Sequence, residues 1–326
     1  MAIFGGLMYF PYFYGRQSEF LALRDIDSDL SPIKTITPVI EPVLRRANGL
    51  IRCMSDLGKG GMNGIIIVNP SQGEFQGVDR DVSKEWREEL DEAFEKYESL
   101  CPAFNVTQTT TKKNLDSFLQ RYPDKNVALI LSSPALSNAE LGEIVSNKRV
   151  RYCGCFPDKM SAAQRNSLPS KKVFEITDGF VKLKRNSDYE GQEFFTDRHL
   201  NFHKNSIGFG DYLALGAALS LTGGQPHAIA IHLTYKRKAD SDIWIEHFVS
   251  TDIEKDVGTI GKKYLQAVEK LVVQIRKRRN EFGNNEALKA YELDLKTGKF
   301  PNLPSNKRRQ IRHHLSLMHQ ILAGEI

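Results

Sequence analysis

Residues 64–69 read Gly-Ile-Ile-Ile-Val-Asn, an apolar run of strand length that ends on a polar amide. Its four apolar residues are all β-branched, which suits a strand, and no polar residue alternates with them. Strands that are apolar on both faces are typical of parallel sheets covered by helices. This stretch therefore predicts an α/β protein with a central parallel sheet.

Similar runs recur on both sides of this stretch, and helix-like segments separate them. The eight strand-like runs span residues 8–14, 36–43, 64–69, 101–106, 126–132, 150–156, 172–177 and 206–213. Parallel neighbours need a crossover that is usually a helix, and eight such units predict a (β/α)8 TIM-barrel-like fold. An open doubly wound sheet is the alternative, although Gly15-Arg16-Gln17 after the first run is not its usual glycine-rich phosphate turn.

The alternation of strands and helices ends near residue 225. Residues 227–236 and 242–250 alternate like two strands joined by a polar turn, which predicts a β-hairpin. An apolar stripe predicts a long helix over 259–279, and two more helices are expected at 284–295 and 305–322. We therefore expect three parts: a barrel-like core (1–225), an inserted β-hairpin (226–258) and a basic helical extension packed on the barrel (259–326).

The positive charge of the chain is concentrated in that extension. Residues 261–326 hold 14 Lys and Arg against six Asp and Glu, a surplus of eight; because the whole chain carries +5, residues 1–260 carry −3. Basic blocks attract phosphates or an acidic partner, although charge runs are usually solvated helix faces. The residues proposed for a nucleic-acid or partner surface are Arg276, Lys277, Arg278, Arg279, Lys307, Arg308, Arg309 and Arg312.

Composition narrows the class of protein. With 40% hydrophobic and 26% charged residues, the 326-residue chain is neither disordered nor collagenous. Four cysteines are too few for a disulfide scaffold, and no window approaches the apolar length of a membrane span. No secretory signal precedes the first run. We expect a soluble cytoplasmic protein that does not bind membranes.

Polar residues at the carboxyl ends of barrel strands face the active site. This rule gathers a set of residues at one mouth: Arg16, Glu41, Asn69, Asn105, Ser132, Asp178 and Asp211. Glu41 ends an apolar run before Pro42, where burial can raise a carboxyl pKa for acid/base work. An ion pair of Glu41 with Arg16, or with another basic residue of the rim, that closes the barrel is an equal alternative.

Glu175 and Asp178 each have two interpretations. A carboxylate within a strand is costly unless it is paired. Glu175 is therefore either an interior residue matched to a cation or a sign that one side of its strand is solvated. Asp178 precedes Gly179 and is either a ligand-binding residue or a turn residue.

Histidines supply a second group of candidates. His232 and His247 are expected to be cross-strand neighbours in the hairpin, where they are either hydrogen-bonded core residues or a general acid/base pair. His199 and His203 have the spacing of one helical face, and Asp197 could add a carboxylate. These three residues are candidate ligands of a divalent metal, with surface histidines as the alternative. The sequence identifies no other cofactor.

Several segments together resemble an uncharacterised bacterial family, related more distantly to the Beta-protein family of phages and bacteria. The segments are Met8-Tyr9-Phe10-Pro11-Tyr12, Gly15-Arg16-Gln17, Leu21-Ala22-Leu23-Arg24, Pro38-Val39-Ile40-Glu41-Pro42, Gly208-Phe209-Gly210-Asp211-Tyr212, residues 228–235 and His247-Phe248-Val249-Ser250. The resemblance implies a gene on a mobile element beside a nuclease-like protein, in a two-component system that defends against phage. It transfers no catalytic residue, and it adds Tyr212 to the ligand-binding candidates.

Two functional hypotheses follow, and a third concerns nucleic acid. The first is a barrel scaffold that binds a nuclease-like effector or senses a phage-derived ligand, with the hairpin or the basic tail as its contact surface. The alternative is a hydrolase of phosphodiester or nucleotide substrates that uses Glu41, Asp211, His232 and His247 for acid/base or metal chemistry. Walker A, G-x-S-x-G and H-E-x-x-H sequences do not occur in the chain. The third hypothesis is direct nucleic-acid binding by the tail.

Overall fold

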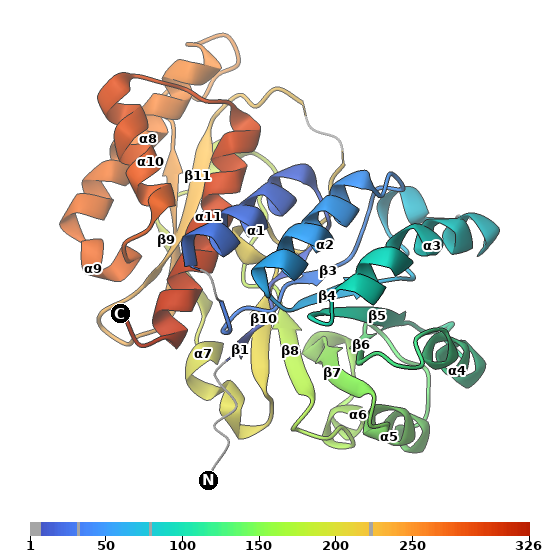
Figure 1. Cartoon of the computed structure of the whole chain (residues 1–326). Coiled ribbons are helices and arrows are strands. Elements are labelled where there is room, and N and C mark those ends of the chain that lie inside the picture. The colour runs from blue at the N-terminus through green and yellow to red at the C-terminus, as the bar shows by residue number, and fades with distance from the viewer. Residues whose placement is uncertain (1–7, 31–32, 78–79, 222–223) are drawn as a thin grey trace. The chain divides into compact units, whose positions relative to one another are not determined.

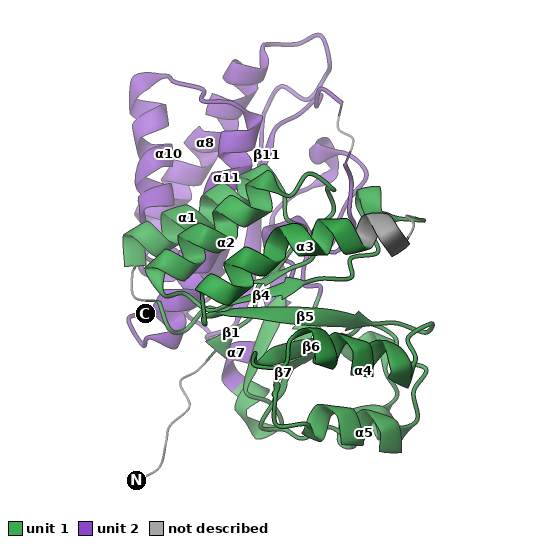
Figure 2. Ribbon diagram, turned by 45° about the vertical axis from the view of Figure 1, so that its right-hand side comes forward, with its two compact units in different colours: residues 1–177, 201–211 green, residues 178–200, 212–326 purple. Residues whose placement is uncertain are grey.

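The computed structural model describes residues 8–30, 33–77, 80–221 and 224–326. These residues form a nine-stranded parallel sheet, a three-stranded antiparallel sheet and the helices connected to them (Figure 1). The chain divides into two compact units (Figure 2). Unit 1 comprises Met1–Thr177 and Asn201–Asp211, and unit 2 comprises Asp178–Leu200 and Tyr212–Ile326.

The parallel sheet belongs to unit 1 and has the strand order β1-β10-β8-β7-β6-β5-β4-β3-β2. Its strands are β1 Met8–Tyr9, β2 Tyr12–Phe13, β3 Val39–Ile40, β4 Gly64–Ile67, β5 Leu100–Val106, β6 Val127–Leu131, β7 Val150–Cys155, β8 Val173–Thr177 and β10 Gly208–Asp211. Each of the eight expected runs contains at least one of these strands, and β1 and β2 share the first. The predicted parallel α/β architecture is confirmed.

One short stretch of chain, residues 8–13, supplies both ends of this strand order. β1 pairs with β10, and β2 pairs with β3. Only Phe10 and Pro11 separate β1 from β2. Phe10 donates its backbone N–H to Phe209 O at 2.8 Å, and Pro11 O accepts from Val39 N at 2.8 Å. The stretch is therefore hydrogen-bonded to a strand on each side.

Aromatic side chains fill one face of the sheet. The Phe10 ring stacks on Phe174 at 3.9 Å, and Tyr152 meets Phe10 edge-on at 5.6 Å. Small residues make room for them, because a Cβ on Gly208 would lie 2.5 Å from the Phe10 ring. Alternate residues of a strand share a face, so Tyr12 lies on the same face as Phe10, and its ring meets Phe156 at 5.9 Å.

Helices connect successive strands of unit 1. The α-helices are α1 Gln17–Leu30, α2 Asn48–Gly60, α3 Arg80–Lys96, α4 Lys112–Arg121, α5 Asn138–Ser146 and α6 Ala162–Asn166; η1 Gly73–Phe75, η2 Pro157–Lys159 and η4 Phe202–Lys204 are single 3-10 turns. Thr111, Ser137 and Ser161 begin α4, α5 and α6 with reciprocal capping boxes. These caps explain why each helix starts close to the end of the preceding strand.

Unit 2 contains the predicted hairpin, β11 Ala230–Lys236 and β12 Ile243–Val249, with a third strand added to it. The strand β9 Gln192–Thr196 pairs antiparallel with β12 and gives the order β11-β12-β9. The strand β9 was not expected from the sequence, because its two central phenylalanines are flanked by polar residues without alternation. The hairpin is therefore part of a larger sheet.

The expected C-terminal helices are confirmed and share a core with the hairpin. They are α8 Ile260–Lys277, α10 Glu286–Thr297 and α11 Leu303–Leu322; shorter elements of this part are α7 Arg198–Asn201, α9 Arg279–Phe282, η3 Asn186–Asp188 and η5 Leu213–Leu215. Apolar residues of α8 pack on Ile231, Leu233 and Tyr235 of β11. The hairpin and the helical extension therefore belong to one compact unit, whereas the sequence analysis separated them.

Helix α11 covers the outer edge of β11. Gln310 Oε1 accepts the backbone N–H of His232 at 2.9 Å, and His313 Nε2 lies 2.7 Å from Thr234 O. These side chains bond backbone groups that a further strand would otherwise bond. In the part of the chain that is described, no helix is long and apolar enough to cross a membrane.

Candidate functional site

Glu41 follows β3 and is buried on the face that carries Tyr12. Its side chain is 1% exposed, and its Oε2 accepts hydrogen bonds from Tyr12 OH at 2.8 Å and Gln72 Nε2 at 2.7 Å. Burial raises the pKa of Glu41, while these two hydrogen bonds, the Ser71 backbone and the charge of Lys159 oppose the rise. The result is a carboxyl group that holds its proton more firmly than an ordinary glutamate.

The ion pair considered between Glu41 and Arg16 does not form. Arg16 instead binds Glu19 at the start of α1, where Nε donates to Glu19 Oε1 at 2.7 Å. The Arg16 backbone N–H also donates to Glu19 Oε2 at 3.1 Å. Arg16 therefore organises the beginning of its own helix.

The polar residues at the carboxyl ends of β4, β5 and β6 do come together. Asn69 and Asn105 exchange two hydrogen bonds, from Asn69 Nδ2 to Asn105 O at 2.9 Å and from Asn105 N to Asn69 Oδ1 at 2.7 Å. Ser132 Oγ donates to Asn105 Oδ1 at 2.5 Å. These hydrogen bonds connect three strand ends to one another. The side chain of Asn69 and the Oδ1 atom of Asn105 are therefore already hydrogen-bonded within the protein.

Asp211 ends β10 on the opposite face of the sheet from Glu41. Gly208 shares a face with Phe10, so Phe209 and Asp211 alternate to the other face. There Tyr9 OH donates to Asp211 Oδ1 at 2.6 Å, and the rings of Tyr9 and Phe209 lie 5.4 Å apart. Glu41 and Asp211 therefore do not form the shared site expected from their strand-end positions.

The remaining candidates near strand ends are Glu175, Asp178 and Tyr212. Glu175 alternates with the inward-facing Phe174 and lines an outer cavity beside Arg165, so it does not point into the aromatic face. Asp178 organises a turn: its Oδ1 accepts Phe180 N at 3.1 Å and its Oδ2 accepts Ala217 N at 2.8 Å. Tyr212 is buried directly after Asp211.

In unit 2, His232 and His247 are cross-strand neighbours, as expected. They are paired in register, and their Nδ1 atoms lie 2.8 Å apart. One Nδ1 must donate and the other must accept, so a single proton lies between two neutral rings. His247 Nε2 is 3.1 Å from Glu193 Oε1 on β9. Glu193, His247 and His232 thus form a hydrogen-bonded chain along which a proton can be transferred.

Aromatic rings enclose this histidine pair. The Tyr189 ring lies 4.5 Å from His232 and 5.0 Å from His247, and Phe180 lies 5.1 Å from His232. Burial lowers the pKa of His232 to about 3, and the positive charge that His247 would carry if it were protonated adds to this shift. Burial also lowers the pKa of His247, against the opposing effect of Glu193. Both imidazoles are therefore neutral at physiological pH.

Acidification should destabilise the protein through this pair. The folded pKa of His232, about 3, lies below its ordinary value of 6.5, so the unfolded chain binds the extra proton between those pH values. One such proton changes the free energy of unfolding by about 1.4 kcal/mol per pH unit. The contribution of His232 is complete above pH 6.5 and is lost progressively as the pH falls toward 3.

Urea unfolding at a series of pH values measures this effect. We expect His232→Gln, which has no titrating group at this position, to show a shallower fall in stability than the wild type below pH 6.5. His313, whose pKa burial lowers to about 4, remains in both proteins as a common background. Equal slopes for the two proteins would contradict the assignment.

The candidate metal ligands Asp197, His199 and His203 do not converge. Helix α7 ends at Asn201, and a 3-10 turn follows, so the helical spacing of the two histidines is not realised. His199 Nε2 lies 2.9 Å from Ser241 O, and His203 belongs to the other unit. Within the described ranges, no three His, Cys, Asp or Glu side chains are grouped as a metal site.

Some basic residues of the tail form ion pairs within the protein, and others are exposed or half-buried on its helices. Arg278 pairs with Glu246 and lies over the Tyr235 ring at 4.7 Å, and Arg309 pairs with Asp294. Arg279 pairs with Glu292 at 3.1 Å. Arg276 and Lys277 are exposed at the end of α8, whereas Lys307, Arg308 and Arg312 are half-buried on α11. Three of the predicted surface cations, Arg278, Arg279 and Arg309, are thus paired with carboxylates of the same unit.

The partners Tyr12, Gln72 and Glu193 were not among the predicted site residues. Tyr12 and Gln72 reach Glu41 from distant segments, and Glu193 lies on the unpredicted strand β9. Only the period-two alternation from Phe10 to Tyr12 could have indicated one of them. A comparison with protein-family models found no match, and a search of curated proteins found no significant match.

Proposed function

We propose that the chain is a (β/α)8-barrel scaffold that acts in the cytoplasm by binding a protein partner, the nuclease-like effector of a two-component anti-phage system. The resemblance of the sequence supports the choice of partner. Closure of the barrel is supported by residues 8–13, which pair with β10 on one side and with β3 on the other. A strand that bonds both ends of a sheet order is what a closed barrel requires.

The observation that carries this choice is the separation of Glu41 from Asp211. Each carboxyl group is buried beside its own tyrosine, and the two lie on opposite faces of the sheet. Acid/base catalysis by a pair of carboxyl groups needs both within reach of the same reacting atoms. Their separation favours structural roles for both residues and therefore favours binding over hydrolysis at this mouth.

The three-stranded sheet carries an aromatic surface that could contact a protein partner. Phe194 on the edge strand β9 is 49% exposed, and its ring lies 6.3 Å from that of Trp244 on β12. The Arg237 guanidinium stacks over Trp244 at 3.6 Å. Trp244 is half-buried, and an exposed aromatic ring beside a second aromatic ring and an arginine is a combination enriched in protein interfaces. We assign the partner contact to this Phe194–Trp244–Arg237 surface.

Co-expression with the nuclease-like neighbour tests the assignment. We expect Phe194→Ser to reduce retention of the tagged partner at least about tenfold, because truncating an aromatic hot-spot residue costs about 2 kcal/mol or more. Leu293→Ser is the matched control, since Leu293 is 57% exposed on α10 and distant in sequence from β9. Equal loss in both variants, or in neither, would remove the assignment.

The second candidate function is hydrolysis of a phosphodiester or nucleotide with Glu41 as general acid. Its raised pKa favours this role. Glu41→Gln keeps an oxygen that accepts from Tyr12 and Gln72, so the variant should fold with an unchanged or higher melting temperature. If the scaffold proposal holds, biological activity survives this change, whereas its loss in a folded Glu41→Gln protein would support the hydrolase.

A further inference from the structure

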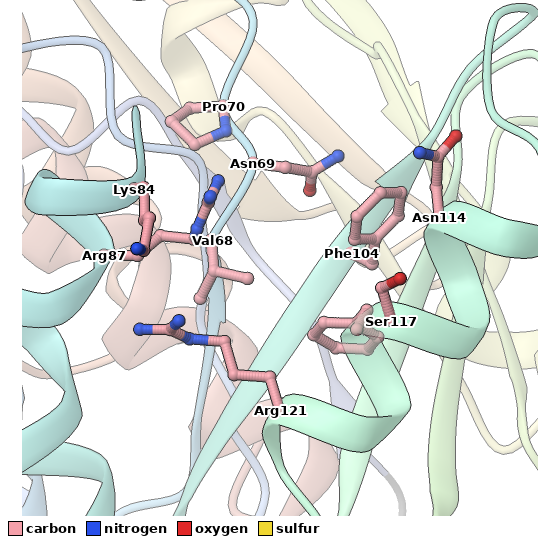
Figure 3. Close-up of a pocket in the computed structure, with 10 residues that line it drawn as sticks. Val68, Asn69, Pro70, Lys84, Arg87, Phe104, Asn114, Ser117 and Arg121 are labelled. Carbon is pink, nitrogen blue, oxygen red and sulfur yellow. The ribbon is translucent and has the colours of Figure 1, made fainter. Parts of the chain in front are cut away.

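A groove in unit 1 lies between α3 and α4, beside the ends of β4 and β5 (Figure 3). Its volume is about 490 Å³, which falls within the range of sites for small molecules. Lys84 and Arg87 enter it from α3, and Asn114, Ser117 and Arg121 enter from α4. None of the candidates named from the sequence except Asn69 lines this groove.

The groove carries unbalanced positive charge. Three of its side chains are cationic, and no acidic side chain among the described residues lines it. Arg121 binds Asp91 at 2.6 Å, and Lys84 approaches Glu88 only to 3.9 Å. No described carboxylate forms an ion pair with Arg87. Burial and then the charge of Arg121 lower the pKa of Arg87, while the charges of Asp91 and Glu88 oppose the fall.

Neutral hydrogen-bond donors and an aromatic wall complete the groove. Asn114 Oδ1 accepts from Thr111 N at 2.9 Å and from Thr111 Oγ1 at 2.8 Å, which leaves the Asn114 amide NH2 as a donor. The half-buried Phe104 ring lies 5.3 Å from Phe118 and forms an apolar surface beside these polar groups. Cations, amide donors and an aromatic face are thus gathered in one cavity.

We propose that this groove binds a phosphate-bearing ligand of nucleotide size. Arg87 and Arg121 supply the planar donor groups that bind phosphate oxygens in pairs, and Lys84 adds a point charge. Phe104 offers a face against which a planar base can pack. A ligand phosphate would give Arg87 the direct ion pair that no described carboxylate forms with it. The proposal goes beyond partner binding and does not depend on it.

Isothermal titration calorimetry with ATP, inorganic phosphate and adenosine tests the proposal. We expect ATP to bind more tightly than either fragment, because only ATP reaches both the cations and the aromatic wall. Arg87→Gln should weaken ATP binding at least about tenfold, through the loss of charge-assisted hydrogen bonds. Ser117→Asp, at an exposed position, should also weaken it by repelling phosphate.

Lys113→Gln is the matched control, because Lys113 is exposed on α4 and lies outside the groove. It removes the same formal charge and should leave ATP affinity within about twofold of the wild type, since exposed charges at a distance are screened. The proposal is overturned if ATP binds no better than about 1 mM, if adenosine binds as tightly as ATP, or if the Arg87 and Lys113 variants behave alike. Partner retention is measured separately, so the two proposals can fail independently.

Discussion

Replacing Arg309 by leucine should lower the free energy of unfolding by about 3 to 5 kcal/mol. Arg309 pairs with Asp294, which is 4% exposed, and donates from Nη1 to Tyr264 OH at 2.8 Å. Tyr264 OH in turn donates to Asp294 Oδ2 at 2.7 Å. The leucine variant leaves the Asp294 carboxylate buried without its cation, which costs far more than losing an exposed ion pair.

Urea unfolding followed by circular dichroism measures this loss. Lys277→Gln, which removes an exposed charge from the same basic tail, should change stability by less than about 0.5 kcal/mol. Adding Asp294→Asn to Arg309→Leu should recover part of the stability, because the uncompensated charge is then gone. If Arg309→Leu changes the free energy of unfolding as little as Lys277→Gln does, Arg309 behaves as a surface cation and its ion pair with Asp294 does not stabilise the fold.

Gly210→Ala should cost about 3 kcal/mol of stability, because its new methyl group would meet backbone. A Cβ at Gly210 would lie 2.1 Å from Phe10 O, in the stretch that joins β1 to β2. Backbone cannot rotate away as a side chain can, so β1 and β10 would have to separate. The variant therefore tests whether the β1–β10 pairing that would close the barrel contributes to folding.

Gly142→Ala provides the comparison for this variant. Gly142 lies in α5, and a Cβ there would meet only Ser167 O at 3.9 Å. Alanine favours helix more than glycine does, so this change should stabilise the protein by about 0.5 to 1 kcal/mol. Thermal and urea unfolding of both variants should therefore shift in opposite directions. If Gly210→Ala leaves the free energy of unfolding unchanged, the β1–β10 pairing is not needed for stability.

The eight strand regions were predictable because buried parallel strands leave continuous apolar runs such as Ile65–Ile67 in the sequence. The opposition of His232 and His247 was predictable because hairpin register follows from alternation and turn length. Helix starts such as Ser137 carry their own cap and were predictable from local sequence. These features depend on neighbours along the chain.

The positions that escaped prediction depend on contacts between distant segments. Asp211 has the strand-end position of a mouth residue, but its face is fixed by the contact of Phe10 with Gly208, and Phe10 belongs to a segment distant in the sequence. Arg309 resembles a surface cation until Asp294 of α10 is placed beside it. The groove around Arg87 combines two helices, the strand β5 and the segment after β4, and neither helix contains a motif that indicates it.

Light scattering coupled to size-exclusion chromatography, applied to the chain co-expressed with the nuclease-like partner that we propose, tests the scaffold proposal most directly. We predict a single species whose mass equals a defined sum of the two proteins for the wild type and for Glu41→Gln. Phe194→Ser should release the two proteins as separate species. Separate elution of the wild-type proteins, or a Phe194→Ser complex as stable as the wild type, would contradict the account.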